Sequence, residues 1–201
     1  MASPNDSSSE RDVWLTIPNV LTLLRLLAII PFSLWAMQGK DRQALILFFV
    51  AGLTDTLDGT IARRFGQTSK IGRLLDPLTD KLFTGASFIV LSVFRGGLSN
   101  IPLWVMFAVL LRDVLILAGS FFVYSAKRNS GFKPSIWGKL NTLLEIAVVI
   151  CFLAVPDVPF VAATLPTLYV ILLISLLISL SDYLRVGLRM LREPVPNGGQ
   201  P

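Results

Sequence analysis

The chain has 201 residues, of which 53% are hydrophobic and 15% charged, with a net charge of +5 and a mean hydropathy of +0.68. Soluble domains carry about 25% charged residues, so this composition excludes a disordered chain, a collagen and a nucleic-acid-binding module. The chain has no histidine and a single cysteine, Cys151, which excludes histidine ligands, an intrachain disulfide and a cysteine-rich metal site.

Six apolar segments follow one another along the chain, and each approaches the 20 or so residues that a helix needs to cross a bilayer. They are residues 17–38, 43–63, 76–94, 102–126, 136–154 and 165–185. We expect the polar residues 1–12 and 193–201 to form disordered tails on either side of one membrane domain, residues 13–192. The expected fold class is therefore an all-α integral membrane protein with six transmembrane helices.

The distribution of Lys and Arg indicates the orientation of these spans, because cytoplasmic loops are enriched in both residues. With the N-terminus inside, twelve basic residues fall on the cytoplasmic side: Arg11, Arg63, Arg64, Lys70, Arg73, Lys127, Arg128, Lys133, Lys139, Arg185, Arg189 and Arg192. Three fall outside: Lys40, Arg42 and Arg95. Both termini are expected to be cytoplasmic, and much of the basic excess then reflects topology and attraction to lipid headgroups.

Four aspartates lie at the cytoplasmic ends of the second and third predicted spans. Asp55 and Asp58 are three residues apart and Asp76 and Asp80 four apart, so each pair shares one face of a helix. Ionisable residues within a membrane are costly, and four carboxylates at a similar depth repel one another unless cations bind. Mg²⁺ prefers oxygen ligands, and two ions about 4 Å apart stabilise displacement at phosphorus. A divalent cation carrier is the alternative of another class.

The Asp76-Pro77 pair predicts that the third span begins here, with Asp76 as the N-cap and Pro77 at the first helical position. The helix dipole would then favour the carboxylate of Asp76. Lys81 follows Asp80 directly, and one interpretation of this residue is that its long side chain extends to the membrane interface.

Residues around the aspartates suit a phosphate-bearing ligand. Gly59 and Ala62 are small enough for a ligand to approach the backbone, and Arg63 lies on the same side as Gly59, four residues away. The guanidinium of Arg63 could therefore clamp a diphosphate. Gly72 lies in the predicted loop before Asp76.

These eight positions and their spacing resemble the signature of the CDP-alcohol phosphotransferases. The matching residues are Asp55, Asp58, Gly59, Ala62, Arg63, Gly72, Asp76 and Asp80. The resemblance implies transfer of a phosphatidyl group from a CDP-linked lipid, CDP-diacylglycerol, to an alcohol, with release of CMP. It also implies a homodimer in a bacterial inner membrane, with the active site on the cytoplasmic side.

The same resemblance implies a role for each motif residue. Asp55, Asp58 and Asp76 would be the main ligands of two Mg²⁺ or Mn²⁺ ions, and Asp80 would bind metal and act as the general base. The CDP-binding residues would be Asp55, Gly59, Ala62, Arg63 and Gly72.

The acceptor is indicated by segments outside the motif. Residues 17–25, 138–142 and 182–185 resemble phosphatidylglycerophosphate synthases and the related cardiolipin synthases. We expect glycerol 3-phosphate as the acceptor, bound by Arg112, Lys139 and Arg185, and phosphatidylglycerol is the alternative. The pair Arg112-Asp113 replaces the Arg-Glu of many phosphatidylglycerophosphate synthases and points towards the cardiolipin branch.

Each acceptor residue also has a purely structural interpretation. Lys139 and Arg185 fit the general excess of basic residues on the cytoplasmic side. Arg112, inside the fourth span, would instead form an intramembrane ion pair with Asp113 or Glu145.

Overall fold

The computed structural model describes residues 17–65, 70–95, 100–126 and 136–192, and this part of the chain is a bundle of six α-helices without β-strands. The helices are α1 (Ile17–Met37), α2 (Asp41–Phe65), α3 (Lys70–Ile89), α4 (Leu103–Ala126), α5 (Ile136–Ala154) and α6 (Leu165–Arg192). A π-helical turn, η1 (Val90–Phe94), continues α3, and a 3₁₀ helix, η2 (Pro159–Ala163), precedes α6. The predicted all-α character and the six helices are confirmed.

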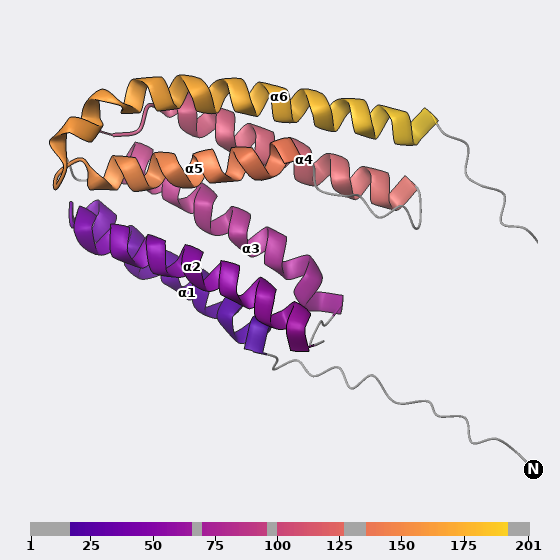
Figure 1. Ribbon diagram of the computed structural model, residues 1–201, viewed down its shortest axis with the longest axis horizontal. Helices are drawn as coiled ribbons and strands as arrows, with labels where there is room; N and C mark the ends of the chain where they lie inside the picture. Colours follow the sequence, from indigo (N-terminus) through magenta and orange to yellow (C-terminus); the bar gives the residue numbers. More distant parts are fainter. Residues whose placement is uncertain (1–16, 66–69, 96–99, 127–135, 193–201) are drawn as a thin grey trace, which may run out of the picture.

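Successive helices run in opposite directions along the bundle (Figure 1). As a result, α1 begins and α6 ends at the same end of the molecule, on the right of the figure. The end of α2 and the start of α3, which carry the aspartate motif, lie there as well. We call this the motif end, and the opposite end the far end.

The start of α3 differs from the prediction. The helix begins at Lys70, so Asp76 and Pro77 lie inside it, and the predicted N-cap at Asp76 is wrong. An interior proline removes one backbone hydrogen bond, yet α1 also continues through Pro31. Local preferences of this kind are a weak guide where packing against neighbouring helices favours a continuous helix.

The turn between α1 and α2 is tight and has a clear backbone cause. Gly39 adopts φ +69°, the left-handed conformation that glycine allows without strain. The amide of Gly39 donates to the carbonyl of Ala36 at 3.1 Å, and the amide of Lys40 donates to that of Trp35 at 2.8 Å. This is the Schellman pattern, and it lets α2 start at once beside α1.

Three phenylalanines, one from each of the first three helices, pack against one another. Phe32 of α1, Phe48 of α2 and Phe83 of α3 form a triangle with ring centroids 5.4–5.9 Å apart. All three side chains are buried. Rings at these separations add to the hydrophobic gain of burial, so the aromatic triangle helps to hold α2 and α3 on α1, against which both helices pack.

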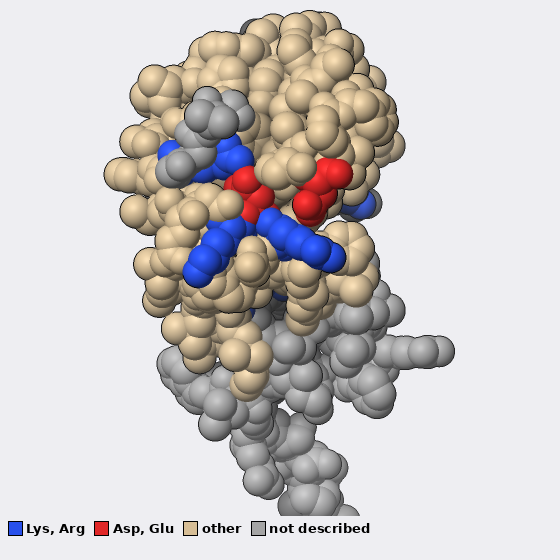
Figure 2. Space-filling view, turned by 90° about the vertical axis from the view of Figure 1, so that its left-hand side faces the viewer, with Lys and Arg blue, Asp and Glu red and all other residues tan. Residues whose placement is uncertain are grey.

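Among the described residues, a small group of charges lies at the far end, surrounded by uncharged side chains (Figure 2). Arg95 donates through Nε and Nη2 to the two carboxylate oxygens of Asp41, at 3.1 and 2.5 Å, and both side chains are buried. The Arg95 guanidinium also lies 4.9 Å from the centre of the Phe152 ring. These contacts tie together α2, the segment after η1 and α5. The other charged residues at this end are Lys40, Arg42 and Asp157.

The outer surface of the bundle is strongly apolar. Large side chains such as Ile30, Phe49, Phe107, Leu111 and Leu143 are exposed, far beyond what the surface of a soluble monomer presents. Among the described residues, two helical segments are long and apolar enough to cross a membrane: Ile136–Ala154 and Leu165–Val186. Shorter apolar helical segments cover Leu23–Met37 and Lys81–Phe94.

Replacing Phe83 by Ala should destabilise the protein, because it removes the ring that contacts both of the others in the aromatic triangle. Losses for buried Phe→Ala changes are about 3–5 kcal/mol. Thermal unfolding in detergent micelles measures the effect. Phe107→Ala, at a side chain that is 62% exposed, is the control and should shift the transition little. Equal shifts for the two variants would contradict a role for the triangle.

Candidate functional site

The aspartate motif is divided between two helices. Asp55 and Asp58, with Gly59, Ala62 and Arg63, lie in the last three turns of α2, and Gly72, Asp76 and Asp80 lie in α3. The side chains of all eight residues are outside the described part of the structure, so their predicted contacts stay predictions. Among the side chains that are described, no group of three acidic, histidine or cysteine residues could hold a metal ion.

The aromatic triangle relates the faces of α2 and α3 that carry these aspartates. Asp55 follows Phe48 by seven residues, and Asp76 precedes Phe83 by seven, which in both cases is about two helical turns. Each aspartate therefore shares a helix face with one of two stacked rings whose centroids are 5.4 Å apart. In both helices the aspartate lies about 10 Å from the ring towards the motif end. Asp55 and Asp76 therefore lie at a similar distance along their helices from the two stacked rings.

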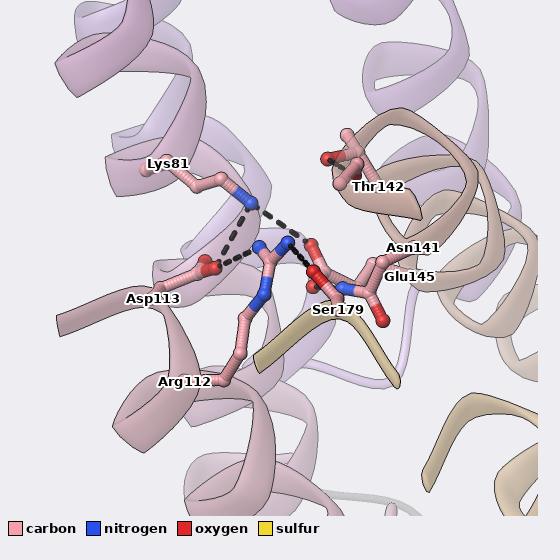
Figure 3. A network of polar contacts seen from close by, with 8 residues as sticks. Lys81, Arg112, Asp113, Asn141, Thr142, Glu145 and Ser179 are labelled. Atoms are coloured by element: carbon pink, nitrogen blue, oxygen red, sulfur yellow. Dashed lines mark hydrogen bonds and ion pairs between the residues drawn. The ribbon is translucent and has the colours of Figure 1, made fainter. Parts of the chain in front are cut away.

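A buried polar cluster lies beside the motif and joins four helices (Figure 3). Its members are Lys81 of α3, Arg112 and Asp113 of α4, Asn141 and Glu145 of α5, and Ser179 of α6. Lys81 belongs to the same helical turn as Asp80, so the cluster and the motif are neighbours along α3.

Both carboxylates of the cluster face Lys81. Its ammonium is 3.0 Å from Asp113 Oδ1 and 3.3 Å from Glu145 Oε2. The predicted extension of Lys81 to the membrane interface is therefore wrong, and the two buried carboxylates are the reason. Glu145 is fully buried, and the side-chain amide of Asn141 donates to its other oxygen.

Arg112 completes the cluster. Its Nη1 donates to Asp113 Oδ1 and its Nη2 to Ser179 Oγ, each at 2.7 Å. The ion pair with Asp113, expected as one interpretation of Arg112, is confirmed. Two cations and two carboxylates then balance each other in a buried site, where an unpaired charge would be strongly destabilising.

Sequence reasoning missed Ser179 and the contact of Asn141 with Glu145. Both could have been found from helical spacing. Asn141 and Glu145 are four residues apart, and Ser175, Ser179 and Asp182 recur every three or four residues in α6. A polar stripe on an apolar helix marks the side that faces the interior of the bundle.

The three residues predicted for the acceptor have different environments. Arg112 is buried, whereas Lys139 and Arg185 are exposed near the motif ends of α5 and α6. The backbone of α5 passes close to Arg112: a Cβ atom on Gly138, the residue before Lys139, would lie 3.6 Å from Arg112 Nη2. The acceptor role itself stays a prediction.

An apolar cavity of about 250 Å³ opens between α1, α2, α3 and α5. Phe48, Leu53, Phe83 and Ile146 are among its lining residues, and Arg25 provides a buried charge. Since Leu53 precedes Asp55 by two residues, the cavity reaches the turn of α2 where the motif begins.

A family model described as CDP-alcohol phosphatidyltransferase matches residues 15–182. The chain is 33% identical over 179 residues to a CDP-diacylglycerol–glycerol-3-phosphate 3-phosphatidyltransferase of Aquifex aeolicus, covering 88% of this chain and 98% of that protein.

The sequence identity to cardiolipin synthases is about the same, but the alignments cover a smaller share of both chains. The CMP-forming cardiolipin synthase of Streptomyces coelicolor is 34% identical over 62% of this chain and 57% of its own. The rat enzyme is 34% identical over 75% of this chain and 53% of its own. The chain thus spans about half the length of these synthases and nearly all of the Aquifex protein.

Proposed function

Because the chain belongs to the CDP-alcohol phosphatidyltransferase family, we propose that it transfers a phosphatidyl group from CDP-diacylglycerol to glycerol 3-phosphate, with release of CMP. The observation that carries this proposal is the alignment with nearly the whole Aquifex enzyme, whose name states that reaction. The apolar cavity beside the motif supports a lipid-linked donor, because its walls would accept an acyl chain.

We propose that residues 13–192 form one membrane domain whose six helices cross the membrane with both termini in the cytoplasm. The shared end of α1 and α6 and the apolar exterior support this. The excess of basic residues at the motif end supports a cytoplasmic active site in a bacterial inner membrane. A homodimer is proposed from family resemblance.

The motif residues fit a pair of divalent cations. The donor set is four carboxylates, which are the hard oxygen ligands that Mg²⁺ and Mn²⁺ prefer. The stacking of Phe48 and Phe83, each about two turns from a motif aspartate, supports a site shared by α2 and α3. Asp55, Asp58, Asp76 and Asp80 would hold the ions. When bound, the ions would polarise the phosphate oxygens and neutralise charge on the entering and leaving oxygens.

The remaining chemistry belongs to the chain's own residues. Asp80 accepts the proton of the acceptor hydroxyl as its oxygen attacks the phosphorus that bears the diacylglycerol. The bond from that phosphorus to the CMP oxygen breaks, and CMP leaves with the electron pair. Arg63, with Asp55, Gly59, Ala62 and Gly72, is proposed to orient the CDP group. No histidine is available for the proton transfer, so a carboxylate is the natural base.

Arg112, Lys139 and Arg185 are proposed to bind the phosphate of the acceptor. The buried Nε of Arg112 has no hydrogen-bond partner among the described residues, and neither has Asn141 Oδ1. Unpaired buried polar atoms are costly, so this part of the cluster is suited to contact with a polar group of the substrate. Cardiolipin synthesis, with phosphatidylglycerol as acceptor, is the second candidate because of the cardiolipin synthases among the relatives.

The test of the function is release of CMP by the purified protein with CDP-diacylglycerol, Mg²⁺ or Mn²⁺ and one acceptor at a time. We expect release with glycerol 3-phosphate. Release only with phosphatidylglycerol would replace the first proposal by the second. No release with either acceptor, together with divalent cation flux into vesicles, would identify a carrier instead.

Asp58→Asn and Asp80→Asn should each reduce turnover at least 100-fold, because each removes a carboxylate from the metal site and the second also removes the base. The steady-state rate of CMP release measures the loss. Asp157→Asn, at an exposed position of the far end, is the control and should retain the normal rate. A near-normal rate for either motif variant would refute the assigned roles.

Lys139→Ala should raise the KM for the acceptor more than the KM for CDP-diacylglycerol, since it removes one positive charge from the proposed phosphate site. Initial rates with each substrate varied in turn give both constants. A larger rise in the donor KM would place Lys139 at the CDP site.

A further inference from the structure

We propose that Glu145 and Asp113 are positioning residues that hold the Lys81 ammonium in the core and so keep it from competing with divalent cations at the aspartate motif. The inference rests on the proposed function, since it assumes that the motif binds metal ions. It concerns the described polar cluster, in which each of these three side chains has a defined contact (Figure 3).

The Lys81 side chain projects from the face of α3 that is turned towards α4 and α5. Consecutive helical residues are turned by about 100°, so Lys81 and Phe83 lie on nearly opposite faces. Phe83 faces α1 and α2 through the aromatic triangle, and Lys81 faces α4 and α5 through Asp113 and Glu145. Asp80, directly before Lys81, lies between these two directions. Lys81 and a proposed metal ligand thus occupy adjacent positions in one turn of α3, and the ion pairs with α4 and α5 hold the Lys81 ammonium on its own side of the helix.

The two cations of the cluster, Lys81 and Arg112, differ in their partners. Arg112 has its own partners in Asp113 and Ser179. Among the described side chains, Glu145 forms its ion pair with Lys81, and its other oxygen accepts from Asn141. Without the Glu145 carboxylate, the ion pairs of Lys81 and Arg112 would both be with Asp113.

Lys81 has room to change its side-chain conformation if its ion pair is lost. Its side chain is 19% exposed, whereas that of Glu145 is fully buried. A lysine released from Glu145 has a flexible stem of four carbons and an opening through which to turn. The next carboxylate along its own helix belongs to Asp80, the preceding residue. An ammonium at that position cancels charge that would attract a divalent cation.

The experiment measures Mn²⁺ binding to the purified full-length protein in detergent micelles without substrates, from the electron paramagnetic resonance signal of free Mn²⁺. Glu145→Gln keeps the shape of the side chain and should weaken binding roughly tenfold, because a unit charge near a dication repels it even at an effective dielectric constant of about 20. The double variant Lys81→Met/Glu145→Gln leaves the cluster neutral and should restore the wild-type affinity.

Asp41→Asn is the matched control. It also converts a buried, ion-paired carboxylate into an amide, but at the far end of the bundle, and Mn²⁺ affinity should not change. Lys81→Met alone should bind Mn²⁺ at least as tightly as the wild type, and this variant carries the test if Glu145→Gln does not fold.

The possible results distinguish the positioning role of Glu145 and Asp113 from the proposed metal site. If the wild type binds Mn²⁺ and Glu145→Gln binds it equally well, the positioning role is wrong and the proposed metal site stands. Weakened binding in Glu145→Gln that the double variant fails to restore, or weakened binding in Lys81→Met, would assign the cluster a merely structural role. No Mn²⁺ binding by the wild type would overturn the metal site of the proposed function and this inference with it.

Discussion

The cost of placing charge inside an apolar bundle governs the organisation of this protein. Its exterior is covered by large hydrophobic side chains, while Lys81, Arg112, Asp113 and Glu145 are gathered in the interior. Such charges are tolerated only when they are paired, and each of the four has an opposite charge within about 3.3 Å. In the proposed membrane orientation the same cost would apply to the four aspartates of the motif, and it is the physical reason to expect cations between them.

α3 carries both a paired interior charge, Lys81, and two aspartates of the motif, Asp76 and Asp80. One face is fixed against α1 and α2 by the ring of Phe83, and the opposite face is fixed against α4 and α5 by the ion pairs of Lys81. A helix held on two sides has little freedom to rotate about its axis. The rotation of α3 about its axis is therefore set by contacts outside the motif, which is the arrangement that a site needing precise ligand geometry requires.

Hydrophobic runs and spacing predicted much of this fold. The helices α1, α2, α4 and α5 begin and end within two residues of the predicted segments, because each follows a long apolar run. By contrast, α3 begins six residues earlier than predicted and α6 ends seven residues later. The predicted start of α3 was wrong because the Asp76-Pro77 pair is a local signal, whereas packing against neighbouring helices favours a helix that begins at Lys70. The partners of Lys81 and Ser179 could not be predicted, since they depend on which faces of α3, α4, α5 and α6 meet. The motif was identified from the sequence by its resemblance to the family signature, and the roles of its residues stay predictions.

The central claim is that the acidic faces of α2 and α3 meet around divalent cations at the motif end. Crystals of the protein grown with Mn²⁺, with diffraction data collected at the manganese absorption edge, test it most directly. The account predicts anomalous peaks between the two helices, within coordination distance of carboxylates from both. Peaks bound by one helix alone, or well-ordered carboxylates from the two helices that point apart with no peak between them, would contradict it.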